Sequence, residues 1–456
     1  MHKIDLELVE MTMDIMKYAI GRISETNPQI GKPKKEAELK ALVGETITPK
    51  GIGGEVAFNL WKEHLMKANV SIDHPRHLAF VPASPTRAAI MFDLVTSASS
   101  IHGAYWMEGA GGIFCENEAM KWIVSLTGLP NTAFGVFTSG GTAANLSAMV
   151  TAREYWRSQH EFKNEKGLII TSVGAHSSIK SMAKVIDVDV LLVETENKLL
   201  GNDLQKTIDS LSPDQRKRLF AVVGTGGTTN AGIIDDLDRI ATICENEKLW
   251  FHVDAAYGGG ALAADSVRHL FNGIERADSI TIDPHKWMFS PYDCGAVIYK
   301  QPELAKKAHS QEGSYLDIFK DEGAQGFNPS EYQIQLTRRV RGLPLWFSLA
   351  MHGTDRYKQA VERGLELAQI AGKLIQDTPY LELVREPSLS CVLYRIKGWK
   401  PEDYTHWTYE NHKNGIALVT PTKWKTGNTF ETVSRFCFIN PDTTEKDIAM
   451  ILDTMA

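Results

Sequence analysis

The chain has 456 residues, which is enough for two or three lobes around a large core, and its formal net charge is −7. This acidic balance, without any basic run, argues against nucleic acid as a partner. No stretch approaches the roughly 18 uninterrupted apolar residues of a membrane span, and the acidic N-terminus is unlike a signal peptide. The five cysteines are scattered without metal-ligand spacing, so we expect a reducing, cytoplasmic location and no metal.

Residues 1–73 are predicted to form a helical segment. Leu6, Val9 and Met13 recur at helical spacing, and Phe58 begins a second apolar run after a link rich in proline and glycine. Such a face is typical of a core or of a partner contact. We expect it to pack against a second subunit.

From residue 101 to residue 114 the chain is rich in glycine and is predicted to be a loop. A long loop with aromatic residues either forms the wall of a binding site or packs as an edge of the protein. We favour the wall, with His102, Tyr105 and Trp106 as candidate contacts.

Short apolar runs then alternate with helical patterns as far as residue 299. Such alternation requires β-α-β crossovers and a mostly parallel sheet, whose ligands lie at the carboxyl ends of the strands. Strands are predicted over 134–138, 167–171, 188–194, 220–223, 249–253, 279–282 and 295–299.

After this sheet the pattern changes. Residues 308–331 are predicted to form a mobile loop over a site or a plain surface connection. Alternation around 381–394 and 434–439 then predicts a small α+β lobe. We therefore divide the chain into a helical segment (1–73), a large domain (74–340) and a small C-terminal domain (341–456).

A pair of glycines, Gly140 and Gly141, opens the helix that follows the strand 134–138. Glycines allow the backbone to approach an anion, and Ser139 and Thr142 add hydroxyl donors next to the helix N-terminus. The spacing of a nucleotide-binding loop is missing, so a single phosphate ester is the better prediction.

Three other strands are followed by polar side chains. Asp254 either caps the next turn or lies under a ring nitrogen, where Ala256 is small enough for a flat ring to lie close. His176 either caps a helix or stacks on that ring. Thr225 either contributes its hydroxyl to the site or is a turn residue.

Lys286 lies between His285 and Trp287, after the strand 279–282 and Pro284. It is either a surface lysine or a nucleophile. A lysine amine forms a Schiff base only when unprotonated, so we expect a pocket flanked by cations that lowers its pKa. A phosphate cradle, a stacking histidine, an aspartate for a ring nitrogen and this lysine together complement pyridoxal 5′-phosphate.

Four motifs in order resemble the group II pyridoxal phosphate-dependent amino-acid decarboxylases, relatives of aromatic-L-amino-acid, glutamate and diaminobutyrate decarboxylases. They are Thr-Ser-Gly-Gly-Thr-Ala-Ala-Asn, Ala-His-Ser-Ser, His-Val-Asp-Ala-Ala-Tyr and Asp-Pro-His-Lys-Trp. The resemblance runs from about His74 to the C-terminus. It implies the α/β architecture of fold-type I enzymes, with a mostly parallel sheet between helices, and a homodimer whose active sites are built from both subunits.

The resemblance also implies residue roles. Lys286 would bind the cofactor covalently, Asp254 would face its pyridinium nitrogen, His176 and Ala256 would lie on opposite ring faces, and Thr225 would lie near its phenolic oxygen. The implied phosphate contacts are Gly140, Gly141, Thr142, Asp283 and His285.

Two positions depart from the family pattern. Relatives have a proton-donating tyrosine in the mobile loop, where this chain has Phe327 and Pro329, so Tyr315 or His176 would have to substitute. Ala83 stands where relatives offer a threonine to the substrate.

The expected reaction is α-decarboxylation of an L-amino acid, with an aromatic side chain (Trp, Tyr or Phe) favoured. The candidate substrate contacts are Phe80, His102, Tyr105, Trp106 and Gly353. Arg435 could instead bind a second carboxylate, which would indicate glutamate or aspartate. The missing loop tyrosine leaves oxidative decarboxylation to an aldehyde as a further alternative, and a scaffold without activity as the last one.

Overall fold

The computed structural model describes residues 4–160, 165–310, 326–427 and 429–456. Most of the predicted mobile loop, including Tyr315, lies outside these ranges. No helix within them is long and apolar enough to cross a membrane.

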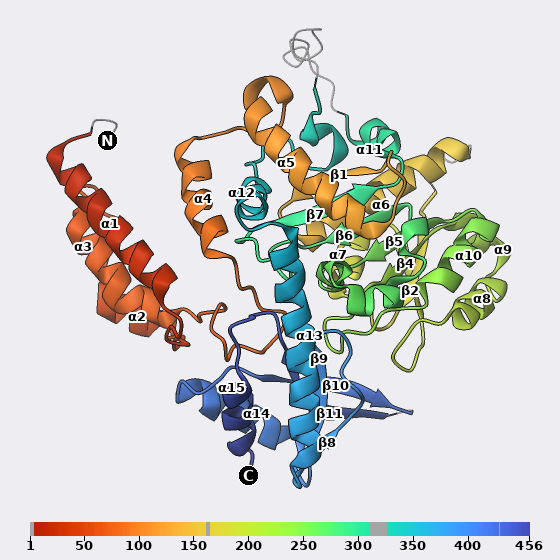
Figure 1. The fold of residues 1–456 in the computed structure, drawn as a ribbon. Helices are drawn as coiled ribbons and strands as arrows, with labels where there is room; N and C mark the ends of the chain where they lie inside the picture. The colour runs from red at the N-terminus through yellow and green to blue at the C-terminus, as the bar shows by residue number, and fades with distance from the viewer. Residues whose placement is uncertain (1–3, 161–164, 311–325, 428) are drawn as a thin grey trace.

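A seven-stranded sheet forms the centre of the large domain, in the order β1-β7-β6-β5-β4-β2-β3 (Figure 1). The run from β3 to β6 is parallel, and β7 is antiparallel to both its neighbours. This confirms the predicted mostly parallel sheet. The strands are β1 (Phe134–Thr138), β2 (Leu168–Ser172), β3 (Asp189–Val193), β4 (Leu219–Thr225), β5 (Trp250–Asp254), β6 (Ser279–Ile282) and β7 (Gly295–Tyr299).

Helices cover both faces of this sheet (Figure 1). Neighbouring residues of one strand pack into different apolar clusters: Ile170 packs with Val222, whereas Ile169 packs with Val223. Burial on both faces explains why runs such as 168–170 and 220–223 are apolar at successive positions. The helices are α5 (Trp106–Thr127), α6 (Gly141–Gln159), α7 (Ser177–Val185), α8 (Gly201–Asp209), α9 (Pro213–Arg218), α10 (Leu237–Glu247) and α11 (Pro302–His309).

The predicted glycine-rich loop over 101–114 is wrong from Trp106 onward, because helix α5 begins there. The glycines serve close packing instead. A Cβ on Gly109 would lie 2.6 Å from the carbonyl oxygen of His102, and one on Gly112 would lie 3.0 Å from the side chain of Val340. Glycine is required here because other segments approach the helix closely, and this signal resembles that of a flexible loop.

The small C-terminal lobe contains an antiparallel sheet in the order β10-β11-β9-β8, which confirms the predicted α+β lobe. Helices α12 (Leu343–His352) and α13 (Thr354–Asp377) connect it to the large sheet. The lobe comprises β8 (Leu381–Leu383), β9 (Cys391–Ile396), α14 (Pro401–Lys413), β10 (Thr420–Thr426), β11 (Thr429–Cys437) and α15 (Glu445–Asp453).

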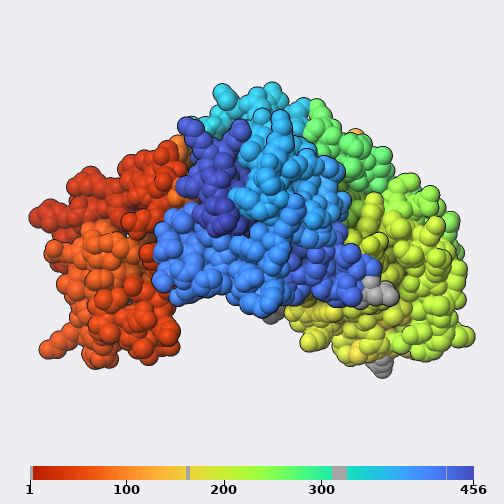
Figure 2. Space-filling model, turned by 90° about the horizontal axis from the view of Figure 1, so that it is seen from below, coloured from red at the N-terminus to blue at the C-terminus, as the bar shows by residue number. Residues whose placement is uncertain are grey.

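Three N-terminal helices form an arm beside the main body (Figures 1 and 2). They are α1 (Leu6–Ser24), α2 (Glu36–Val43) and α3 (Gly54–Leu60), and none of them contains a buried residue. Helix α4 (Arg87–Ala98) follows and packs against α12.

Candidate active site

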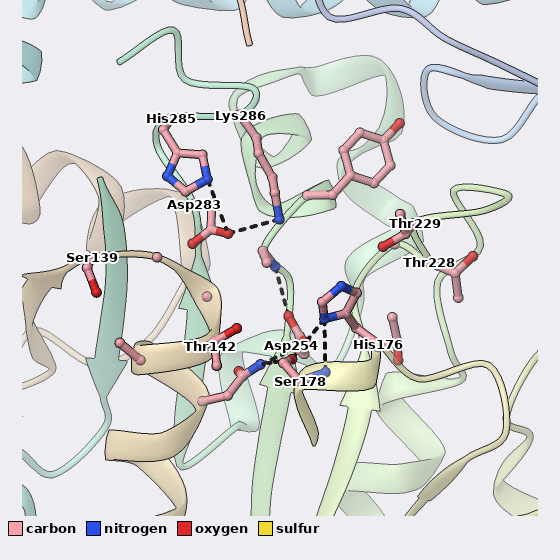
Figure 3. A pocket seen from close by; sticks show the side chains of 18 residues that line it. Ser139, Thr142, His176, Ser178, Thr228, Thr229, Asp254, Asp283, His285 and Lys286 are labelled. Atoms are coloured by element: carbon pink, nitrogen blue, oxygen red, sulfur yellow. Dashed lines mark hydrogen bonds and ion pairs between the residues drawn. The ribbon is translucent and has the colours of Figure 1, made fainter. Parts of the chain in front are cut away.

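A cavity of about 260 Å³ lies at the carboxyl ends of the central strands (Figure 3). Its walls come from the segments that follow β1, β2, β4, β5 and β6, as expected for a parallel sheet. Its lining includes all the candidates chosen from the strand ends: Gly140, Gly141, Thr142, His176, Thr225, Asp254, Ala256, Asp283, His285 and Lys286.

Lys286 points into this cavity from the turn after β6, and its Nζ lies 2.9 Å from Oδ2 of Asp283 (Figure 3). His285 Nε2 lies 3.7 Å from the same oxygen. Burial lowers the pKa of Lys286, but the charge and hydrogen bond of Asp283, together with the charges of Asp254 and Tyr292, outweigh burial and leave this pKa raised. The expectation of a cation-flanked lysine with a lowered pKa was therefore wrong: the neighbouring charge is a carboxylate.

The carboxylate of Asp254, at the end of β5, is held by two donors. Its Oδ1 accepts a hydrogen bond of 3.1 Å from the backbone amide of Ala256, and its Oδ2 accepts one of 3.0 Å from Nδ2 of Asn145. The residue is only 5% exposed. The bond to Ala256 confirms the predicted cap on the turn. The side chain also lines the cavity, and its place under a ring nitrogen stays a prediction.

His176 is the N-cap of helix α7 and lines the cavity. Its Nδ1 accepts a hydrogen bond of 3.2 Å from the backbone amide of Ser178, and Oγ of Ser178 lies 2.9 Å from the same nitrogen. A backbone amide can only donate, so Nδ1 carries no proton in the neutral ring and the proton resides on Nε2.

The glycine pair forms a shallow cradle at the start of α6. Gly140 has φ of 142°, which favours glycine. A Cβ on Gly141 would lie 2.9 Å from Oδ2 of Asp283 and 3.2 Å from Cβ of Ala256. Helix α6 begins at Gly141, so its first amide groups have no partner within the helix and are available to an anion.

Thr225 ends β4 at the cavity wall. Its backbone amide donates a 2.8 Å hydrogen bond to Oδ2 of Asp235, whose Oδ1 accepts one of 2.8 Å from the amide of Leu199. Burial raises the pKa of Asp235 to about 6. Asp235 therefore fixes the strand end, and the sequence analysis did not identify it.

The predicted substrate contacts Phe80, His102, Tyr105, Trp106 and Gly353 do not line this cavity. Phe80 is 61% exposed, and Nδ1 of His102 lies 2.6 Å from Oε2 of Glu108. Tyr105 is buried, and Trp106 donates its backbone amide to Asn328. Within one chain, the structure does not bring these side chains to the cavity.

Arg435 is buried, and backbone carbonyls occupy its guanidinium group. It donates to Phe80 at 2.6 Å, to Thr229 at 2.9 Å and to Asn230 at 3.1 Å. Arg435 therefore holds the loop after β4 against the small lobe, which leaves little capacity for a substrate carboxylate.

Sequence reasoning missed several residues of the lining: Asn145, Ser178, Thr228, Thr229 and Tyr257. Asn145 and Ser178 lie within motifs that were noticed, but on helices where a polar residue is commonplace. The ring of Tyr257 stacks on Trp287 at 5.4 Å, a contact that only the fold creates.

Residues 58–397 match the model of the pyridoxal-dependent decarboxylase conserved domain. The chain belongs to this pyridoxal-dependent decarboxylase family. An aromatic-L-amino-acid decarboxylase of Bacillus atrophaeus is 29% identical over 91% of this chain and 87% of its own. An L-2,4-diaminobutyrate decarboxylase of Acinetobacter baumannii is 29% identical over 80% of this chain and 75% of its own. The crystal structure of Rhodiola rosea 4-hydroxyphenylacetaldehyde synthase superposes with a TM-score of 0.86 at 22% identity, over 99% of this chain and 98% of its own.

The protein is thus a pyridoxal 5′-phosphate-dependent amino-acid decarboxylase, and the cavity fits the cofactor of this family. A glycine cradle with free helix amides suits a phosphate, and a buried carboxylate suits a protonated ring nitrogen. Oδ1 of Asp283, beside the lysine, is buried without a hydrogen-bond partner in the described chain.

The raised pKa of Lys286 leads to a prediction. Replacing Asp283 with Asn removes the charge that stabilises the ammonium form, so the pKa of Lys286 falls. Absorbance measures the rate at which pyridoxal phosphate attaches covalently to the apoprotein. The pH profile of this rate should shift to lower pH by roughly one to three units. The Lys286→Ala protein serves as the blank. An unchanged pH profile would contradict the role of Asp283.

Proposed function

We propose that this decarboxylase acts on L-amino acids with an aromatic side chain and releases the amine and carbon dioxide. The charge of the cavity supports this choice. Among the described residues that line it, the one lysine or arginine is Lys286, and Asp283 already pairs with it. A second carboxylate on an acidic substrate would meet no unpaired lysine or arginine among the described residues of this lining. The Bacillus atrophaeus relative, named for aromatic substrates, is consistent with this proposal.

We assign the following roles to the cavity residues. Lys286 attaches the cofactor, and Asp283 controls the pKa of that lysine. Asp254 faces the ring nitrogen and keeps it protonated, while His176 and Ala256 hold the two ring faces. The bound cofactor withdraws electrons from the substrate α-carbon, which allows the carboxylate to leave as carbon dioxide. Gly140, Gly141, Thr142 and His285 surround the phosphate, and Thr225 lies near the ring.

A panel of the twenty amino acids tests the substrate class. We expect kcat/KM for Trp, Tyr or Phe to exceed that for Glu and Asp by at least ~100-fold, because a carboxylate buried without a cation is costly. Released carbon dioxide is the measurement. Preferential turnover of Glu or Asp would exclude an aromatic specificity, and no release from any amino acid would favour the scaffold alternative.

We assign the proton that replaces the carboxylate to Nε2 of His176. This nitrogen carries the ring proton, because Nδ1 accepts from the amide of Ser178. Phe327, which lies in the part of the chain where relatives have a tyrosine, stacks on Tyr332 at 4.5 Å and offers no proton.

The variant His176→Phe retains an aromatic ring and loses this proton. Amine formation should fall by roughly 100-fold or more, and a larger share of the product should be aldehyde. In that reaction dioxygen takes the two electrons and becomes peroxide, and water releases the nitrogen as ammonia. The measurement is amine, aldehyde, ammonia and peroxide per carbon dioxide released. Unchanged amine production would overturn the role of His176. Aldehyde as the main product of the unmodified protein would instead favour the oxidative reaction, for which the Rhodiola rosea structure is a precedent.

We also propose that two copies of the chain associate through the N-terminal arm, residues 1–73, and share their active sites. Helix α1 packs on α3 through Tyr18, whose ring lies 5.6 Å from that of Phe58. The opposite side of α1 exposes Leu6, Val9 and Met13, which are 82%, 45% and 55% exposed. A second copy would cover this face. Because Phe80, His102, Tyr105, Trp106 and Gly353 lie outside the cavity of their own chain, we assign their substrate contacts to the cavity of the partner.

Charges on this face should disrupt the assembly. The double variant Val9→Asp, Met13→Asp should raise the dissociation constant of the dimer by at least ~100-fold, because it buries two carboxylates in place of apolar side chains. Sedimentation velocity measures the change, and the activity should fall in parallel. Thr12→Asp, a neighbouring position off this face, is the matched control. A monomeric and active unmodified protein would contradict the proposal.

A further inference from the structure

A continuous chain of buried hydrogen bonds runs away from the cavity behind Asp254. Oδ2 of Asp254 accepts from Nδ2 of Asn145 at 3.0 Å, and Oδ1 of Asn145 lies 2.9 Å from Nε2 of His252. Nδ1 of His252 lies 2.8 Å from Oγ of Ser279, which accepts from the indole Nε1 of Trp250 at 2.8 Å. The chain thus crosses from α6 to β5 and β6.

The two ends of this chain determine the direction of every bond in it. The carboxylate of Asp254 can only accept and the indole nitrogen of Trp250 can only donate. Asn145 must therefore turn its amide nitrogen toward Asp254 and its oxygen toward His252. That oxygen requires a proton on Nε2 of His252, which leaves Nδ1 to accept from the hydroxyl of Ser279.

The side chains of this hydrogen-bond chain are buried along its whole length. His252 and Ser279 are 0% exposed, Asn145 is 1% and Trp250 is 5% exposed. Burial lowers the pKa of His252 to about 4, so the ring is neutral at neutral pH. Bonds in such a low-dielectric environment polarise one another, and a bond to a charged acceptor is stronger than one between neutral groups.

The same asparagine also reaches the other catalytic group. Nδ2 of Asn145 donates to Oγ of Ser178 at 3.1 Å, which leaves the hydroxyl proton of Ser178 for Nδ1 of His176 at 2.9 Å. One amide group therefore orients both the carboxylate and the histidine of the cavity.

We propose that Asn145, His252, Ser279 and Trp250 are positioning residues that hold the carboxylate of Asp254 and aim it at the cofactor ring nitrogen. This inference rests on the proposed role of Asp254. Each residue acts through the next, so the effect of losing a donor should fall with its distance from Asp254. The contribution should appear only when the bound ring has a nitrogen for Asp254 to face.

Cofactor affinity tests this proposal without any substrate. Apoproteins are titrated with pyridoxal 5′-phosphate and with its 1-deaza analogue, in which carbon replaces the ring nitrogen. We expect Asn145→Asp to weaken pyridoxal phosphate binding by about tenfold or more and Ser279→Ala by roughly threefold. Trp250→Phe should have the smallest effect. Binding of the analogue should change by less than about twofold in each variant, because no interaction with Asp254 is lost.

Thr171→Val is the matched control. It removes a buried hydrogen bond of 2.9 Å to the carbonyl of Val223 in the same sheet and does not touch the chain of donors. It should leave both affinities unchanged. Equal weakening of cofactor and analogue in Asn145→Asp and Ser279→Ala would show a merely structural role and overturn the proposal.

Asp254→Asn separates this proposal from the proposed function. If Asp254→Asn weakens the binding of the cofactor and of the analogue equally, the role of Asp254 itself is wrong. If Asp254→Asn weakens the binding of the cofactor alone, and the Asn145 and Ser279 variants weaken both equally, only the donor chain is wrong. Nitrogen-15 spectra of the unmodified protein, labelled at histidine, provide a test that needs no variant to fold. In these spectra His252 should carry its proton on Nε2 from pH 6 to pH 9. A proton on Nδ1 would overturn the chain.

Discussion

The site depends on a buried carboxyl group, that of Asp254, which hydrogen-bond donors hold at the end of a parallel strand. Asp254 is 5% exposed, and a charge in that position is unfavourable unless hydrogen-bond donors surround it. The fold supplies these donors from two directions: the amide of Ala256 in the following turn and the side chain of Asn145 on α6. β5 lies in the middle of the sheet, where β4 and β6 pair with its backbone at Asp254, and Asn145 on α6 holds the carboxylate itself.

Lys286 and Asp283 form an ion pair elsewhere in the cavity. Lys286 and Asp283 neutralise each other across 2.9 Å, and the attraction raises the pKa of the lysine. A raised pKa holds the amine as a cation when no cofactor is bound. A cofactor bound through Lys286 would take this amine from Asp283, so we expect the carboxylate to control when the lysine becomes available.

The strand ends were predictable because short apolar runs, glycines and prolines mark them directly. Gly140, His176, Asp254 and Lys286 follow such runs, and a parallel sheet brings their side chains to one edge. The charge that faces Lys286 was not predictable, since sequence does not show where the carboxylate of Asp283 points. Asn145 was missed because its partners are 107 and 109 residues away along the chain. The glycines around Gly109 imitate a loop because close helix packing and flexibility both select glycine.

The central claim is that the amine of Lys286 carries the cofactor. Reduction of the cofactor-loaded protein with borohydride fixes this bond, and peptide mass spectrometry then locates the modified lysine. The account predicts a single pyridoxyl group on Lys286. A label on any other lysine, or no label on a protein that binds the cofactor and releases carbon dioxide, would contradict it.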